Sequence, residues 1–296
     1  MNRLFDVITV SGSDARAFLQ GQLTQDVDRL AATPSVLSAW CNPKGRVITV
    51  MRLLDMGDGD DEIGLVVPAG LSGSLVRRLL MFRFRARVEV ETPGFEWEAV
   101  AVSDDADLAE LETLDLLPAG NGSLVSRRRK LVAIDLAIEP RCVEVYGAVA
   151  AFRNAGLGFR RTLTETEWQL ALINAGIPLI LAATSEQYTP HMLNLDRLGA
   201  VSFNKGCYTG QEVVARTQHL GKSKRRLMHF RTDGNAVAVG EKLRHEERDV
   251  GEVVNAIGED LLAVVPVELH GLTLLANGVR AAPVPLPYEL PPVEAP

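Results

Sequence analysis

Residues 205–212 read KGCYTGQE, and the interpretation of the whole chain depends on this stretch. One cysteine, Cys207, stands there among two glycines, a lysine, a tyrosine, a glutamine and a glutamate. A cysteine in such a setting is a nucleophile, a metal ligand, a residue of a ligand pocket, or a small side chain in a tight turn. The neighbouring residues bear on each alternative.

A helix is predicted directly after this stretch. Thr209 and Glu212 have the T-x-x-E spacing of a capping box, so the helix should begin near Gly210. It continues through QEVVARTQHL and ends at Gly221. Cys207 is therefore expected just outside the helix N-terminus, before the capping residue.

The setting of Cys207 has features of a functional cysteine. The positive end of the helix dipole and the nearby Lys205 both favour a thiolate. Gly206 and Gly210 allow the backbone to turn sharply and to approach a ligand closely. An ordinary glycine-rich turn with a buried cysteine fits the same residues, so these features alone do not decide between the two.

Three familiar motifs are absent or unsupported near this cysteine. Its glycine spacing is G-x-x-x-G, whereas a dinucleotide-binding turn has G-x-G-x-x-G. Residues 221–223 end like a phosphate-binding loop, but that loop needs glycine at position 216, which is Arg216. A cysteine hydrolase needs a partner histidine, and the sequence places neither His191 nor His219 beside Cys207.

Length and composition indicate a cytosolic protein of about two domains. The chain has 296 residues, 47% of them apolar, which is enough for a sizeable core. Its longest apolar runs have the length of strands, well short of the ~18 residues that span a bilayer. The first residues, MNRLFDVITV, do not resemble a signal peptide. Because the net charge is −7, a polyanion site requires a local basic patch.

The cysteines and histidines do not predict a metal site. Cys41, Cys142 and Cys207 are far apart in sequence, and no C-x-x-C pair occurs. Three thiols cannot supply the four ligands of a cluster. The histidines are scattered as well, so we expect neither a disulfide framework nor a bound metal.

The first ninety residues alternate strand and helix patterns. Residues 42–45, Asn-Pro-Lys-Gly, are a strong turn signal between two apolar segments and predict a hairpin. Ser13 is a possible N-cap for a helix within 11–30. Strands are expected at 4–10 and 62–67 and a short helix at 71–82.

Residues 82–91, FRFRARVEVE, show the cleanest alternation of apolar and charged residues in the chain. This pattern predicts a half-buried strand whose solvated face carries Arg83, Arg85 and Arg87. A second basic run consists of Lys222, Lys224, Arg225 and Arg226. Each run is a solvated cluster, or the two together form a site for a polycarboxylate.

The rest of the chain divides into the end of an α+β body and a small β domain. Residues 103–130 are expected to be a variable connection, followed by strands at 131–138 and 142–147. Thr164 and Glu167 form a capping box for a further helix. Short β-like segments beyond 222 predict a barrel. The expected units are a body over 1–220, a barrel domain over 222–282 and a proline-rich, extended or disordered tail over 283–296.

With these segments in place, the chain resembles a known family. KGCYTGQEVVART (205–217) is similar to the signature of the YgfZ family of folate-binding proteins. That family is related to the glycine cleavage system T-protein and to mitochondrial iron–sulfur cluster assembly factors. The segments 18–27, 41–47 and 184–212 and the arginine strand resemble the family as well, so the resemblance spans about residues 10–230.

The resemblance implies an α+β fold, a T-protein-like ring of three subdomains. Two interleaved ferredoxin-like or mixed subdomains and a C-terminal β-barrel would surround a central hole that accepts tetrahydrofolate. It also implies a role in assembling or repairing iron–sulfur clusters in client enzymes, including tRNA-modifying ones, with Cys207 as the functional thiol. The cofactor-binding candidates are Lys205, Gly206, Tyr208, Gly210, Gln211, Glu212, Glu186 and Arg216.

Two positions depart from the relatives. The T-protein carries an aspartate pair on the strand after the glycine turn, and one member is needed for aminomethyl transfer. Residues 45–50 here read GRVITV, with no acid until Asp55, so the carboxylate for acid–base chemistry is missing. The aminomethyltransferase reaction is therefore not expected. His191 stands where the family has glutamine, and no role is assigned to it.

Chemistry suggests how folate would be held. A carboxylate can grip the donor edge of a pterin bidentately, while an apolar slot holds the faces of the ring. Glu186 and Glu212 are the candidate acids, and the basic runs could receive the anionic glutamate tail.

Three functions remain open from the sequence. They are a folate-binding accessory factor for iron–sulfur proteins, a one-carbon transferase with a relocated acid, and a regulatory binding protein without chemistry. The expected partners are folate and iron–sulfur clients, with no stable nucleic acid and no membrane, in a cytoplasmic monomer or weak dimer. Because one chain offers a single well-placed cysteine, an iron–sulfur cluster would be transient unless a dimer or an external thiol holds it.

Overall fold

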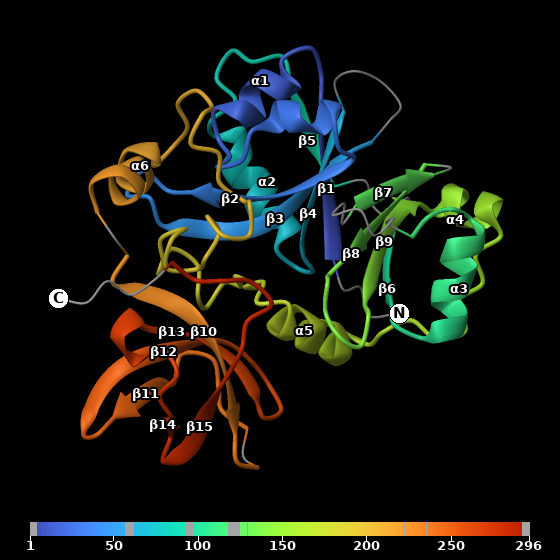
Figure 1. Ribbon diagram of the computed structural model, residues 1–296. Helices are drawn as coiled ribbons and strands as arrows, with labels where there is room; N and C mark the ends of the chain where they lie inside the picture. The colour runs from blue at the N-terminus through green and yellow to red at the C-terminus, as the bar shows by residue number, and fades with distance from the viewer. Residues whose placement is uncertain are drawn as a thin grey trace.

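The computed structural model describes residues 5–56, 62–92, 97–117, 125–128, 130–221, 223–234 and 236–291. Within these ranges the chain forms a five-stranded sheet, a four-stranded sheet and a closed barrel (Figure 1). The expected α+β architecture with a C-terminal β-barrel is therefore confirmed.

The first sheet is antiparallel and has the order β2-β3-β4-β1-β5. Its strands are β1 (Phe5–Ser11), β2 (Ser35–Cys41), β3 (Val47–Asp55), β4 (Ile63–Pro68) and β5 (Glu89–Glu91). Apolar side chains of α1 (Ala15–Gln20), the 3-10 helix η1 (Val27–Ala31) and α2 (Ser72–Leu80) share a core with one of its faces. The hairpin at 42–45 is confirmed: it joins β2 to β3, with Gly45 at φ +67°.

The predicted cap of α1 is wrong. Asp14, not Ser13, is the N-cap residue, and its side chain makes no capping hydrogen bond. Its carboxylate accepts instead from the backbone N–H of Arg87, 2.8 Å away. A contact between distant parts of the chain has therefore replaced the local one.

The predicted strand over 82–91 is wrong in its first seven residues. Residues 82–88 form turns and irregular backbone, and only Glu89–Glu91 pairs with β1. Phe82 packs against the core, whereas Phe84 has φ +42° and is 86% exposed. An alternating pattern describes which side chains could share a face, but here the chain turns before the face is complete.

The second sheet has the order β6-β9-β8-β7. Its strands are β6 (Trp97–Val102), β7 (Val125–Arg128), β8 (Leu131–Asp135) and β9 (Val143–Ala148). Two helices, α3 (Asp105–Thr113) and α4 (Val149–Ala155), pack on one face. Segment 103–130 is therefore more than a connection, because it contains both α3 and β7.

The helix α5 (Glu165–Asn174) lies where the two sheets face one another. It begins at the predicted capping box, in which the Thr164 and Glu167 side chains each bond the other's backbone N–H. Its Trp168 shares a core with the remaining face of each sheet. This helix therefore joins the two α+β units.

The barrel closes in the order β10-β13-β12-β11-β14-β15. Its strands are β10 (Arg225–Thr232), β11 (Lys242–His245), β12 (Arg248–Ile257), β13 (Asp260–Pro266), β14 (Leu274–Ala276) and β15 (Val279–Val284), with a 3-10 helix η2 (Val267–Leu269) after β13. Its interior is apolar, with Phe230 fully buried. The outer face, through Leu227 and Leu262, packs on the body.

The proline-rich end is extended and packed against the body over its described part. Residues 283 and 284 complete β15. The Tyr288 hydroxyl donates to the Gly176 carbonyl over 2.8 Å, and Leu286 joins the core between barrel and body. Residues 292–296 lie outside the described residues. No helix in the described ranges is both long and apolar enough to cross a membrane.

Candidate functional site

The helix after KGCYTGQE begins where the sequence predicted but is capped differently. α6 spans Gln211–Leu220, and its N-cap is Gly210, at φ +82°, without a side-chain cap. Thr209 and Glu212 therefore do not form a capping box. Instead the Gln211 side-chain oxygen accepts from the backbone N–H of Tyr208 over 3.3 Å, which closes the turn.

Gly210 is placed against the β2–β3 hairpin. A Cβ atom at position 210 would lie 2.4 Å from the Asn42 carbonyl oxygen and 3.0 Å from the Gly45 Cα. A Cβ atom at position 45 would in turn lie 2.8 Å from the Cβ of Val213. Only residues without a side chain allow this approach, so α6 and the hairpin turn interlock by backbone contact (Figure 1).

Lys205 holds the other end of the stretch. Its ammonium donates to the carbonyls of Leu23 and Gln25, each over 2.9 Å, and lies 5.4 Å from the centroid of the Tyr208 ring. Burial lowers the pKa of Lys205 to about 8. The lysine therefore binds segment 23–25, and it makes no hydrogen bond with Cys207 among the residues described.

The three cysteines differ sharply in environment. Cys207 is exposed, whereas Cys41 and Cys142 are buried. Burial raises the pKa of each buried thiol to about 12. A buried, protonated thiol is a poor nucleophile and metal ligand. Cys207 is therefore the thiol that a partner can reach.

Glu186 lies at the hairpin turn, but its carboxylate is already engaged. Its two oxygens accept from Arg78 over 2.5 Å and from Asn42 over 2.6 Å. These hydrogen bonds hold its pKa below the usual range. Glu212 and Arg216 are exposed on α6. The structure thus shows a surface ion pair at Glu186 where the sequence suggested a free acid for a pterin.

The second basic run is used largely inside the fold. Arg226 is buried in a bidentate pair with Asp196, with nitrogen–oxygen distances of 2.6 and 3.0 Å. Arg225 donates to the carbonyls of Val250 and Val264. Lys222 lies outside the described residues. In this structure, Arg225 and Arg226 hold the barrel together and to the body, and so do not offer a ligand site.

The histidines near the stretch have structural contacts. His191 is buried, its Nε2 lies 3.1 Å from the Gln218 side-chain oxygen, and burial lowers its pKa. His219 packs edge-on against Phe203. Among the described residues, no group of three or more His, Cys, Asp or Glu side chains could hold a metal ion.

Sequence reasoning missed a buried polar cluster between the sheets. Glu144 accepts from Arg52 over 2.9 Å and from the Trp168 indole N–H over 2.8 Å, and it is 1% exposed. Tyr146 lies in the same space, of about 40 Å³, which has room for a few ordered waters at most. No local motif marks these residues, because they come from three elements far apart in sequence.

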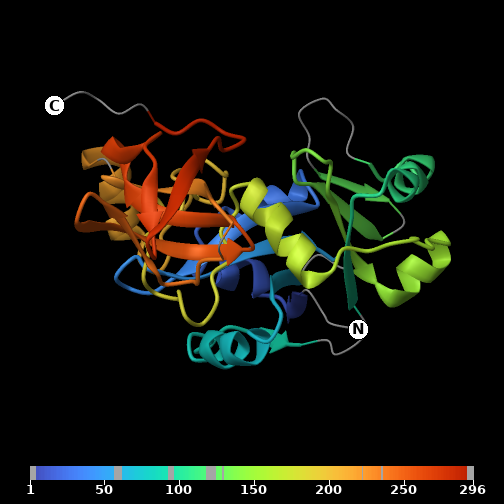
Figure 2. The same cartoon turned by 90° about the horizontal axis from the view of Figure 1, so that it is seen from below.

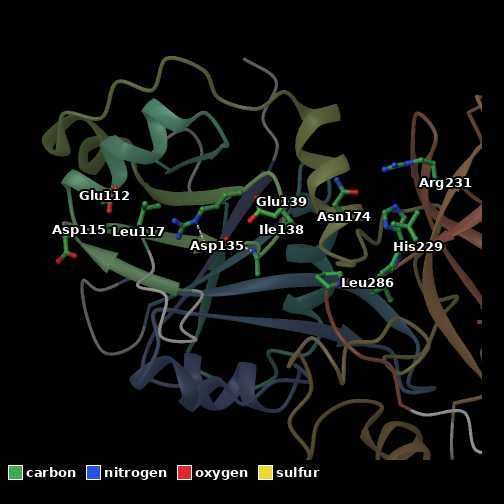
Figure 3. A pocket seen from close by; sticks show the side chains of 15 residues that line it. Glu112, Asp115, Leu117, Asp135, Ile138, Glu139, Asn174, His229, Arg231 and Leu286 are labelled. Carbon is green, nitrogen blue, oxygen red and sulfur yellow. Dashed lines mark hydrogen bonds and ion pairs between the residues drawn. The ribbon is translucent and has the colours of Figure 1, made fainter. Parts of the chain in front are cut away.

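A much larger cavity, of about 1140 Å³, lies between the second sheet, α5 and the barrel. Figure 3 shows carboxylates, including Glu112 and Asp135, at one end and His229 and Arg231 at the other. Asp135 is paired with Arg141, and Arg231 with Asp260. The resemblance implied a central hole between three subdomains, but none of the residues that line this cavity was among the predicted site residues, since its walls meet only through the three-unit arrangement.

Comparison with curated proteins identifies relatives over most of the chain. The tRNA-modifying protein YgfZ of Enterobacter sp. (strain 638) is 31% identical over 269 residues, which covers 86% of this chain and 78% of the relative. That of Yersinia pestis (strain Pestoides F) is 30% identical over 268 residues, or 85% and 77% of the two chains. The chain belongs to the YgfZ family. No family model matches it.

Among solved structures, this chain resembles the glycine cleavage system aminomethyltransferase T from Bartonella henselae. The TM-score is 0.65 at 17% identity, over 95% of this chain and 82% of the other. At that identity the likeness establishes the fold alone. Residues 45–50, at the start of β3, contain no carboxylate, as the sequence already showed.

Three of the segments that resemble the YgfZ family, 18–27, 41–47 and 184–212, meet in one place. Residues 205–211 contact the segment after α1 through Lys205 and the hairpin turn through Gly210. Glu186 reaches the same turn through Asn42. The exposed Cys207 therefore lies between two fixed points. On one side the Lys205 side chain bonds backbone carbonyls, and on the other the Gly210 backbone packs against the hairpin turn.

Proposed function

We propose that this YgfZ family member is a folate-binding accessory protein for assembly or repair of iron–sulfur clusters in client enzymes, tRNA-modifying enzymes among them. Its reactive group is the Cys207 thiol. The observation that carries the proposal is that Cys207 alone of the three cysteines is exposed, on a segment braced at both ends. The names of the relatives, tRNA-modifying protein YgfZ, point to the same client class.

The cluster is cargo in this proposal. A cubane or rhombic cluster needs four protein or exogenous ligands, and one exposed thiol supplies a single one. The Cys207 thiolate would therefore ligate one iron atom only transiently, while client or small-molecule thiols supply the remaining ligands. A cytoplasmic monomer or weak dimer suits this role, and sedimentation of the purified protein tests the oligomeric state.

Complementation of a deletion strain tests the thiol. Cys207→Ser should lose the activity of cluster-dependent tRNA-modifying enzymes, while Cys142→Ser should retain it. Both proteins must accumulate in the cell and melt near the wild-type temperature. Misfolding is then excluded as the cause of any loss of activity in Cys207→Ser. Full rescue by Cys207→Ser would remove the thiol from the proposal.

Tetrahydrofolate is tested against three places in the structure. At the hairpin turn, the Glu186 carboxylate is occupied by Arg78 and Asn42, and the exposed Glu212 lines neither of the two cavities. Between the sheets, Glu144 has aromatic neighbours, but the space of about 40 Å³ is far below the ~300 Å³ of a small-molecule pocket. The cavity of about 1140 Å³ is large enough.

The charges of the large cavity also suit folate. Glu112 and Glu139 line the wall on the side of the second sheet, where they can accept from the donor edge of a pterin. Arg231, on the barrel side, is half-exposed; it pairs with Asp260 through Nε and Nη2, and its Nη1 can face the anionic glutamate tail. The residues present therefore fit the cofactor, which would supply a one-carbon carrier next to the body of the protein.

Calorimetry with tetrahydrofolate separates the candidate places. Glu139→Gln and Arg231→Gln should each weaken binding by roughly tenfold, the size expected for loss of a charged hydrogen bond. Glu186→Gln and Glu212→Gln should leave it unchanged. The reverse pattern would move the ligand to the hairpin turn, and absence of binding by the wild type would end the folate part of the proposal.

A second candidate, folate-dependent aminomethyl transfer, is favoured by the fold likeness to aminomethyltransferase T. It requires a carboxylate near the hairpin, and residues 45–50 have none. Turnover of methylene-tetrahydrofolate with an amine donor tests it directly. Turnover that survives Cys207→Ser would favour this candidate over the first.

A further inference from the structure

The surface at the end of α2 combines exposed arginines with an exposed aromatic ring. Phe84 is 86% exposed and Met81 67% exposed, the two highest values among the large apolar side chains described. Arg77, Arg83 and Arg85 are exposed beside them. We call these five residues the Arg–Phe surface. In Figure 2 the α2 ribbon, in teal, projects from the lower edge of the molecule.

The backbone holds Phe84 outward. Phe82 is anchored inside, with its ring 5.9 Å from that of Trp40. The chain then turns, with Arg83 N–H donating to the Leu80 carbonyl and Ala86 N–H to the Arg83 carbonyl. Phe84 takes φ +42° in this turn, a conformation that non-glycine residues rarely adopt and that costs free energy. A large ring held outward at that cost has no role in the core.

The local charge is opposite to that of the whole chain. Residues 77–87 contain five arginines and no acid, although the net charge is −7. Two of the five have acidic partners from other segments: Arg78 pairs with Glu186 and Arg87 with Asp14. The side chains of Arg77, Arg83 and Arg85 make no ion pair or hydrogen bond with any other described residue. Three cations are thus left for an external anion.

We propose that the Arg–Phe surface docks RNA at a single-stranded loop. Arginines neutralise phosphates, and an exposed ring between them stacks on an unpaired base, the combination that single-strand binders use. A duplex would offer phosphates but no free base for Phe84. A flat acidic protein surface would pair with the arginines but would give the Phe84 ring no partner to stack on.

This inference goes beyond the proposed function, which needs no RNA contact. It also departs from the expectation of no stable nucleic-acid partner, which rested on net charge. Net charge describes the electrostatic field of the whole chain. Salt screens distant charges, so the field at a surface patch depends mainly on the charges within about one Debye length of it. The ion pair of Arg78 with Glu186 connects this surface to the hairpin turn beside Gly210, so bound RNA would lie on the side of the candidate site.

Fluorescence anisotropy with a labelled, unmodified tRNA transcript tests the proposal, with a fully paired RNA duplex of equal length as the comparison. The double variant Arg83→Ala/Arg85→Ala should weaken tRNA binding on the order of tenfold at physiological salt. Its slope of log K against log salt should be shallower by about 1.4, for two lost contacts at ~0.7 each. Phe84→Ala should cost about tenfold as well, and Phe84→Trp should restore most of that loss.

The control is Arg248→Ala/Arg280→Ala, which removes the same charge from exposed barrel positions. It should leave binding within about twofold of wild type. All four positions of the two double variants are exposed, so melting temperatures should not change. Equal losses in both double variants, equal affinity for the duplex and the tRNA, or no binding by the wild type would each overturn the proposal.

Discussion

At the scale of single residues, the reactivity of the thiols follows from burial. Cys207 is exposed, and the pKa values of Cys41 and Cys142 are raised to about 12 by burial. A thiolate that a disulfide reagent can reach attacks the reagent and releases one reagent thiolate. Native protein should therefore release one equivalent of reagent thiolate per chain rapidly, and protein in denaturant should release three equivalents. Cys207→Ser should abolish the rapid phase, and a rapid phase that survives would contradict the burial of the other two.

Lys205 gives a prediction for pH. Its pKa falls from the usual 10.5 to about 8 in the folded protein, mainly because burial disfavours the charged amine. Between about pH 8 and pH 10.5 the unfolded chain then binds more protons than the folded one, so this residue makes stability rise with pH across that window. Below pH 8 it contributes no slope.

The measurement compares wild type with Lys205→Met. Urea unfolding at about pH 7.5 and about pH 10 should show a rise for wild type relative to the variant, on the order of 1–3 kcal/mol, after subtraction of the titrations common to both. Parallel pH profiles for the two proteins would show that the carbonyls of Leu23 and Gln25 compensate the burial of the ammonium.

At the scale of elements, the junction of α6 with the hairpin is the most constrained feature. Gly210→Ala would force a side chain into φ +82° and place its Cβ 2.4 Å from the Asn42 carbonyl oxygen. We expect a loss of at least about 2 kcal/mol in the free energy of unfolding. A Cβ atom at position 206 would meet no other atom within 4 Å, and the φ of Gly206 is ordinary, so Gly206→Ala should cost less than about 0.5 kcal/mol. Similar losses for the two would contradict the interlocking.

The two T-x-x-E motifs show what local sequence can and cannot predict about a helix N-terminus. Thr164 and Glu167 form the predicted box, whereas Thr209 and Glu212, with the same spacing, do not. The difference is Gly210, which takes a left-handed conformation so that α6 can approach the hairpin. The position of the helix was predictable from its pattern, but its cap depended on a contact with residues far away in the chain.

At the scale of the whole molecule, the sequence pattern predicted the structural units but not the places where they meet. The hairpin, the α+β body and the barrel were all expected, because turn residues and glycine-separated strands leave local marks. Two features leave no such mark: the large cavity and the buried cluster at Glu144. Both arise where units separated by many residues meet, and the partner of Glu144 is Arg52, 92 positions earlier.

That buried pair yields a test of how the two sheets are held together. Arg52 lies on β3 of the first sheet and Glu144 on β9 of the second, and the carboxylate is 1% exposed. Arg52→Met leaves this carboxylate without its cation, which should cost about 3–5 kcal/mol of unfolding free energy. The double variant Arg52→Met/Glu144→Gln should recover part of that loss, because a glutamine oxygen is uncharged and still accepts from the Trp168 indole N–H.

A matched surface pair supplies the control. Arg244 and Asp249 on the barrel lie 3.1 Å apart but are 52% and 60% exposed, so Arg244→Met should cost no more than about 0.5 kcal/mol. If Arg52→Met costs as little, water reaches the space between the sheets and Glu144 is hydrated there. The pair would then be accessible to solvent and to ligands, and Glu144 would replace Glu139 as the first acid to test for tetrahydrofolate.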